Sequence, residues 1–459
     1  MSKIFLISSN TTVKPQPVFP LGMALVASAL IHNGHIVRQF DMLFNQEAAN
    51  DLLEDSLLQF EPDFIGISIR NIDDVDSMTR DWYLKAVKDL VKRIKCVSGK
   101  PVILGGSAFS IMPEQILDFT KADFGIVGEG EKAFPDLIND FLSKKKPKKI
   151  TRLKDKQIKG AEFFSPFFEK ELVDFYVDKS GMLNYQTKRG CPFECNYCAY
   201  PLIEGRQFRM QDPGFVVQNI MEIKRKFDVH SVFFTDSVFN DSQNQYLEIA
   251  EELLRQKCEI KWAAYFRPSK IAPDELQLLK KSGLYAMEIG SDAACDTTLQ
   301  GIGKSFHFES ILALNEACVE AEIACAHFFM FGGPGETDQT IAESLKNIEK
   351  LNKCVVFGFS GIRILPGTGI QKIAIDEKII DKDECLLKPC YYVSPLVEKQ
   401  KMETDILLAF KKRKEWLFPP SEGEIRMRTL QLFGFKGLIW DMLINFSNTN
   451  FKKRNIRTA

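Results

Sequence analysis

The chain has 459 residues, a formal net charge of −1 and 45% apolar residues. This length predicts two or three domains, and the near-zero charge argues against a general nucleic-acid binder, which is normally basic. The 11 cysteines are an odd number in a long chain, which argues against a secreted disulfide scaffold. No signal-peptide pattern and no apolar run long enough to span a membrane is present, so we expect a cytoplasmic protein.

Residues 1–145 alternate short apolar runs with amphipathic stretches. The predicted strands are Ile4–Ser8, Ile36–Phe40, Phe64–Ile69, Val102–Leu104 and Phe124–Val127. The predicted helices are Gly22–His32, Trp82–Cys96, Glu114–Phe119 and Lys132–Leu142. This alternation predicts an α/β domain with a doubly wound parallel sheet, in which ligands bind outside the carboxyl ends of the strands.

A lysine-rich run, Lys144–Lys149, follows this domain. Proline inside a block of like charges is typical of a solvated linker, and we assign residues 146–180 to it. The alternative is a patch that binds phosphate or a partner.

Strand–helix alternation resumes at residue 181 and continues to residue 375. The predicted strands are Leu183–Thr187, His230–Thr235, Ile260–Tyr265, Ala286–Ile289, Ala324–Phe331 and Val355–Ile364. Six such units are fewer than the eight of a closed barrel, so we expect a partial, open (βα)6 barrel. Residues 376–459 break the pattern and predict a small, mainly helical lid, with helices around Thr404–Phe410 and Gly434–Phe446.

Three cysteines, Cys191, Cys195 and Cys198, lie within eight residues directly after the first barrel strand. Three thiolates can hold three corners of a cubane cluster and leave the fourth iron open, as a reactive centre requires. A zinc loop is the alternative, but it needs a fourth Cys or His, and none lies near in sequence.

The Cys-x3-Cys-x2-Cys spacing, with Tyr197 before the last cysteine, resembles the radical S-adenosylmethionine (SAM) family. The resemblance implies a [4Fe–4S] cluster whose free iron binds SAM, cleavage of SAM to a 5′-deoxyadenosyl radical, and an electron donor such as flavodoxin or ferredoxin. A cation such as Arg206 could pair with the SAM carboxylate. The SAM contacts that the resemblance suggests are Tyr197, Arg206, Glu288, Ser291, Gly333 and Arg363.

The order of α/β domain, cysteine loop and Gly332–Thr337 resembles the cobalamin-binding branch of that family, over roughly residues 1–375. The implied cobalamin contacts are Ser68, Gly105, Gly106, Ser107, Gly128, Glu129 and Gly130. Residues 1–150 contain no Asp-x-His-x-x-Gly, so the resemblance supplies no lower axial histidine. The alternative is a vestigial domain that only packs on the barrel.

We therefore expect a cobalamin-dependent radical SAM methyltransferase that methylates an unactivated carbon of a small-molecule or lipid-like substrate. The alternatives are a radical cyclisation or rearrangement without methyl transfer, and a passive electron-transfer or scaffold protein. Ser68–Asp73 and Gly105–Ser110 also resemble a subgroup associated with lipid-biosynthesis clusters, including ladderane-type ones.

The C-terminal tail combines apolar residues with a basic end. These are Leu430, Leu432, Phe433, Phe435, Leu438, Ile439, Trp440, Leu443, Ile444 and Phe446, followed by Lys452, Lys453 and Arg454. Such a segment is compatible with peripheral contact to an anionic membrane. Packing of the same apolar face on the barrel is the alternative.

Overall fold

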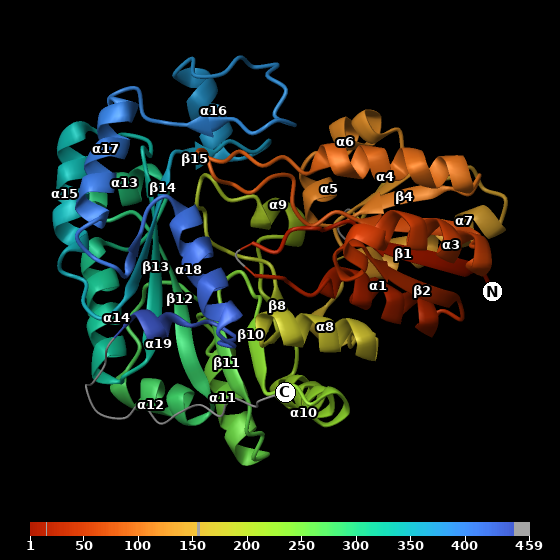
Figure 1. The fold of residues 1–459 in the computed structure, drawn as a ribbon, viewed down its shortest axis with the longest axis horizontal. Helices are drawn as coiled ribbons and strands as arrows, with labels where there is room; N and C mark the ends of the chain where they lie inside the picture. Colours follow the sequence, from red (N-terminus) through yellow and green to blue (C-terminus); the bar gives the residue numbers. More distant parts are fainter. Residues whose placement is uncertain (15, 154–156, 445–459) are drawn as a thin grey trace.

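The computed structural model describes residues 1–14, 16–153 and 157–444. Two α/β units lie side by side, the N-terminal unit in red to orange and the barrel unit in green to blue (Figure 1). Within the described residues, no helix is both long and apolar enough to cross a membrane.

The N-terminal unit contains a parallel six-stranded sheet in the order β2-β1-β3-β4-β5-β6. Its strands are β1 (Lys3–Ser8), β2 (Ile36–Asp41), β3 (Phe64–Ser68), β4 (Val102–Gly105), β5 (Phe124–Val127) and β6 (Ile150–Arg152). The main helices are α1 (Leu21–His32), α3 (Ala49–Phe60), α4 (Leu84–Val97), α6 (Pro113–Thr120) and α7 (Gly130–Leu142). The predicted doubly wound sheet is confirmed, and its strand order places the switch point for ligands between β1 and β3.

The segment predicted as a linker contains regular structure. Strand β6 extends the first sheet, and α8 (Lys170–Ser180) packs against the N-terminal unit, where the Tyr176 hydroxyl donates to Asp41 at 3.1 Å. The short apolar stretches of this region are insufficient to reveal these contacts from sequence. The lysines of Lys144–Lys149 are exposed.

The second unit contains a parallel seven-stranded sheet in the order β17-β14-β13-β12-β11-β10-β7. Its strands are β7 (Leu183–Tyr185), β10 (Ser231–Phe234), β11 (Lys261–Phe266), β12 (Leu284–Asp292), β13 (Ala324–Phe331), β14 (Val355–Ser360) and β17 (Trp416–Leu417). The helices that follow the strands are α10 (Pro213–Phe227), α11 (Gln245–Arg255), α12 (Pro273–Lys281), α14 (Phe308–Glu320) and α15 (Asp338–Ile348). The predicted six-stranded partial barrel is confirmed, and the C-terminal region adds β17 at its edge.

The C-terminal region closes the end of the barrel lumen at which the strands begin. Small residues on three strands, Ala263, Ala286 and Ala324, form one apolar cluster with Leu438 and Trp440. After α17 (Lys399–Phe410) and α18 (Pro420–Leu432), the one further helix up to residue 444, where the described part of the chain ends, is α19 (Trp440–Leu443).

The predicted long helix over Gly434–Phe446 is therefore wrong within the described residues. Gly434 and Gly437 have φ values of 82° and 86°, in the left-handed region that interrupts a helix. Phe446 and the basic end Lys452–Arg454 lie outside the described residues.

Candidate active site

The cysteine loop begins where β8 (Lys188–Arg189) ends, next to its antiparallel partner β9 (Arg209–Met210). Gly190 has a φ of 87°, and a Cβ there would lie 2.0 Å from the carbonyl oxygen of Gln207, so only glycine fits. Further along, the backbone N–H of Asn196 donates to the Ile302 carbonyl at 3.0 Å. The loop is therefore fixed at both ends to other parts of the barrel.

The three thiols lie on one short loop, and each could bind a separate iron of a cluster. Cys191 is buried, Cys195 and Cys198 are half-buried, and all are free thiols. Among the described residues, no three Cys, His, Asp or Glu side chains converge tightly enough for one metal ion. A cubane needs no such convergence, because each thiolate binds a different iron. Burial raises the pKa of Cys198 to about 12, so iron binding must displace its proton.

Tyr197 belongs to a buried polar cluster beside the cysteine loop. Lys304 Nζ donates to the Tyr197 hydroxyl at 3.1 Å and forms an ion pair with Asp292 at the end of β12. Burial opposes the charged amine, yet Asp292 and Tyr197 hold the pKa of Lys304 well above its usual value. Lys304 and Asp292 were not predicted from the sequence, and they place a fixed cation next to the three thiols.

A different arginine from the predicted one lies near the thiols. The Arg206 side chain is 61% exposed, and its nearest anion is Glu194 at 3.9 Å. Arg267, just after β11, is held between the rings of Phe193 and Phe306, with its guanidinium carbon 4.5 and 5.0 Å from their centroids. Burial lowers the pKa of Arg267, whereas Cys195 and Cys191 raise it. Arg267 is thus the better placed partner for an anionic group at the cysteine loop.

The glycine loop after β13 is organised by its own glutamate. Glu336 accepts hydrogen bonds from the backbone amides of Gly332 and Gly333 at 2.5 and 2.9 Å. Burial raises the pKa of Glu336 to about 7 despite these amides. A Cβ at Gly333 would lie 2.9 Å from a Thr298 methyl group, so close packing already requires this glycine.

Arg363, predicted to contact SAM, makes protein hydrogen bonds through its guanidinium nitrogens at the contact between the two units. Its Nε donates to Asp73 at 2.8 Å, and its other nitrogens donate to the carbonyls of Ile364 and Leu386. The side chains of Arg363 and Asp73 are 2% and 3% exposed. This guanidinium holds the barrel to the N-terminal unit, and its contact with SAM stays a prediction.

Glu129, predicted to contact cobalamin, has a similar structural role. Its carboxylate accepts from the Ile158 amide at 2.7 Å and pairs with Arg209 at 2.5 Å and Arg189 at 3.5 Å. Arg189 also pairs with Glu131. This buried network connects the N-terminal unit to the strand that leads into the cysteine loop, so the Glu129 carboxylate is committed to protein contacts.

Glu288 and Ser291 lie on opposite faces of β12. The Ser291 hydroxyl is 2.8 Å from Nδ1 of His327, and both residues are fully buried. His327 follows Cys325 on the helix-facing side of β13, as alternation along a strand requires. Ser291 is thus engaged with a core histidine, and its contact with SAM stays a prediction.

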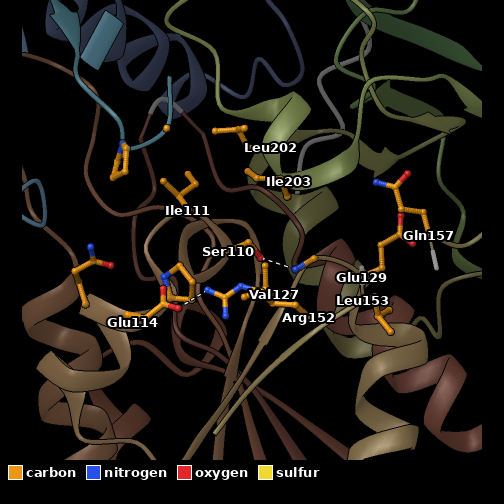
Figure 2. Close-up of a pocket in the computed structure, with 15 residues that line it drawn as sticks. Ser110, Ile111, Glu114, Val127, Glu129, Arg152, Leu153, Gln157, Leu202 and Ile203 are labelled. Atoms are coloured by element: carbon orange, nitrogen blue, oxygen red, sulfur yellow. Dashed lines mark hydrogen bonds and ion pairs between the residues drawn. The ribbon is translucent and has the colours of Figure 1, made fainter. Parts of the chain in front are cut away.

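A cavity of about 500 Å³ lies at the carboxyl ends of β4, β5 and β6, a size typical of ligand sites. In Figure 2, Ser110, Val127 and Arg152 lie on the side of the N-terminal sheet, and Leu202 and Ile203 of α9 (Tyr200–Glu204) face them from the barrel unit. Gly128 lines the cavity with a φ of 84°, and its amide donates to Ser110 at 2.9 Å. Of the predicted cobalamin residues, Gly128 and Glu129 line this cavity.

The other predicted cobalamin residues form a tight turn pair beside this cavity. Gly106 has a φ of 97°, and a Cβ there would lie 2.5 Å from the Ile69 carbonyl oxygen. The Ser107 hydroxyl donates to the Arg70 carbonyl at 2.7 Å, and the Ile69 amide donates to Gly105 at 2.9 Å. Ser68 ends β3, and Gly130 begins α7. These turns shape the carboxyl edge of the sheet and fit a cofactor that approaches it from the barrel side.

Two family descriptions match the chain. The radical SAM superfamily matches residues 185–348, and the B12 binding domain matches residues 10–138. Tryptophan 2-C-methyltransferase from Streptomyces laurentii is 23% identical, over 78% of this chain and 72% of that protein. Hopanoid C-3 methylase from Methylococcus capsulatus is 25% identical, over 62% of this chain and 57% of that protein.

Solved structures share the whole architecture. TsrM, a radical SAM methyltransferase from Kitasatospora setae solved with cobalamin and a [4Fe–4S] cluster, is similar with a TM-score of 0.84 and 19% identity, over 96% of this chain and 97% of that chain. OxsB, a cobalamin-dependent SAM radical enzyme, is similar with a TM-score of 0.71 and 16% identity, over 95% of this chain and 71% of that chain. The chain thus combines a region similar to the B12 binding domain with a following region similar to the radical SAM superfamily, in the order that these solved structures share.

Proposed function

We propose that this chain is a cobalamin-dependent radical SAM methyltransferase that acts on a small molecule. One observation carries the proposal: the cavity at the carboxyl edge of the B12-binding sheet is closed on the barrel side by α9, which begins two residues after Cys198. The cysteine loop and the cobalamin edge therefore face each other across one interdomain space.

Each cofactor has a set of residues that suits it. We propose that Cys191, Cys195 and Cys198 hold the cluster, and that the turns at Ser68, Gly105–Ser107 and Gly128–Gly130 border the corrin. When bound, the cluster supplies reductive cleavage of SAM, and the corrin supplies a carrier for a methyl group.

The surrounding side chains position SAM and exclude water. We propose that Arg267 pairs with the SAM carboxylate, while Tyr197, held by Lys304, closes the site beside the thiols. Gly333, kept in place by Glu336, lets the backbone approach SAM closely. A flavodoxin or ferredoxin as electron donor, and contact with a membrane surface, remain predictions.

The test uses the anaerobically reconstituted full chain, hydroxocobalamin, SAM carrying a deuterated methyl group, and a chemical reductant such as titanium(III) citrate, which supplies the electrons for SAM cleavage and for reduction of the corrin cobalt. We expect 5′-deoxyadenosine in the products and the deuterium label in the corrinoid fraction. Cys195→Ala should lose both signals, whereas Cys96→Ala, an exposed cysteine of α4, should keep them. 5′-Deoxyadenosine without a labelled corrinoid would favour radical rearrangement, and the absence of both from the wild type would overturn the proposal.

A further inference from the structure

Glu288 lies on the lumen face of β12, beside Tyr265 on β11 and Ala326 on β13. Ala286, two residues earlier on the same face, belongs to the lumen cluster. Asp292, near the cysteine loop, is four residues further along, which is roughly 13 Å at the usual strand rise. Glu288 is therefore deeper in the barrel than the cluster cysteines.

The Glu288 carboxylate is buried and makes no direct ion pair with any described residue. It is 7% exposed, and among the described residues no Lys, Arg or His forms an ion pair with it. Burial raises the pKa of Glu288 to about 7, and the nearby Trp440 indole offsets this only in part. The Trp440 Nε1 atom itself makes no full hydrogen bond. The Glu288 carboxylate thus has the Trp440 indole N–H beside it in the lumen, and this contact only partly offsets its burial.

Three side chains from separate elements border the space in front of Glu288. Tyr265 and Tyr200 are each 43% exposed, and Arg70 after β3 is also exposed. Yet burial raises the pKa of Tyr265 and lowers the pKa of Arg70. These side chains have accessible surface although protein surrounds them, so the space that they border is enclosed and is not bulk solvent. Tyr265 interacts electrostatically with Glu288, Tyr200 and Arg70, which places all four around that space.

Aromatic rings form the other wall of the lumen. Phe328 stacks on Phe357 with their centroids 5.0 Å apart, and Phe357 meets Trp440 edge-on at 5.4 Å. Such a wall favours a flat, ring-containing ligand. An acyl or isoprenoid chain has no donor for Glu288 and would leave a buried carboxylate unpaired, which is unfavourable.

We propose that Glu288 is the substrate-recognition residue of this lumen, and that it takes a ring-containing substrate which presents an amine or a ring N–H to its carboxylate. This inference rests on the proposed methyltransferase function and names the substrate class of that site. It also moves Glu288 from the SAM site, where the family resemblance placed it, to the substrate site. The lipid-like substrates considered from the sequence are therefore disfavoured.

The test measures binding of three matched probes to the reconstituted full chain with SAM, by calorimetry: 2-phenylethylamine, 2-phenylethanol and 3-phenylpropionate. The wild type should bind the amine about tenfold or more tightly than the alcohol, because hydrogen bonds to a charged group are the strong ones. The anionic probe should bind most weakly. Glu288→Gln, which keeps the side-chain shape, should reduce the amine preference to about twofold or less.

Glu384→Gln removes an exposed carboxylate on the loop before β16 (Tyr391–Tyr392) and is the matched control; it should keep the wild-type preference. The wild-type order of the three probes needs no variant, so it remains informative even if Glu288→Gln fails to fold. Equal affinities, no binding of any probe, or a tenfold preference retained by Glu288→Gln would overturn the inference.

SAM cleavage and corrinoid labelling are recorded on the same samples. An amine preference without either signal would overturn the proposed function and leave the binding site standing. Both signals without an amine preference would overturn the proposed binding site and leave the methyltransferase function standing.

Discussion

Arg363 and Asp73 form an ion pair at 2.8 Å although they are 290 residues apart in the chain. Asp73 follows β3 of the B12-binding unit, and Arg363 belongs to β15 (Ile362–Arg363) of the barrel unit. Together with the Arg189–Glu131 and Arg209–Glu129 pairs, this contact fixes the two cofactor-binding edges relative to each other.

Arg363→Ala should destabilise the chain by about 3–5 kcal/mol, because it leaves the Asp73 carboxylate buried without its partner. Denaturant unfolding of the apo chain measures this loss. Lys170→Ala breaks an exposed pair with Asp174 on α8 and should change the free energy of unfolding by less than about 0.5 kcal/mol. Equal effects of the two variants would contradict the proposed role of the buried pair.

Arg267→Met should weaken SAM binding by about tenfold or more, since a charge-assisted hydrogen bond to the SAM carboxylate is lost. Equilibrium dialysis with the cluster-loaded chain gives the dissociation constant. Arg206→Ala is the matched control and should stay within about threefold of the wild type, because Arg206 is largely exposed. A larger loss of SAM binding in Arg206→Ala than in Arg267→Met would assign the SAM carboxylate to Arg206.

The chain loaded with hydroxocobalamin should show a base-off corrin spectrum, since no histidine lines the cavity at the carboxyl edge. Gly128→Val should reduce the corrin retained after desalting, because valine tolerates a φ of 84° poorly and its side chain enters the cavity. Gly99→Ala, at a position with open space, should retain the wild-type amount. A folded wild type that retains no corrin would favour the vestigial-domain alternative.

Stability should depend on pH through Glu288. Its folded pKa of about 7 lies above the ordinary value of 4.5, so the folded state binds a proton that the unfolded state releases. The apo chain therefore loses up to about 3 kcal/mol from this group as pH rises from about 4.5 to 7. Glu288→Gln should be more stable than the wild type at pH 8, with the difference disappearing near pH 4.5. If the free energy of unfolding of the two proteins changed with pH in the same way, Glu288 would not be a buried carboxylate without an ion pair.

The sequence alone was sufficient to predict a site where the residues that carry the chemistry lie in one short segment. The cysteine spacing needs no tertiary information, and the strand alternation was regular enough to indicate both sheets. The family resemblance suggested that Ser291 and Glu288 both contact SAM. Side chains three residues apart on a strand, however, point to opposite faces. Arg267 carried a usable signal as the cation that directly follows β11, but the family resemblance directed attention to Arg206.

Other roles depend on partners that no local pattern reveals. Arg363 and Glu129 looked like ligand contacts because each lies in a turn after a strand, and only the docked units show that both are saturated by protein groups. The tail was apolar enough to predict burial or a membrane face, and the lumen alanines that accommodate it are distributed over three strands.

The residues that close the lumen floor, Leu438–Trp440, are translated after every strand of the barrel. A nascent barrel on the ribosome therefore has an open end lined by apolar side chains until Leu438–Trp440 have been synthesised. During that interval the lumen is accessible from both sides, and its exposed apolar surface is a risk for aggregation. Premature termination before Leu438 would leave the strands formed but the floor missing, so such products should depend on chaperones and be degraded rapidly.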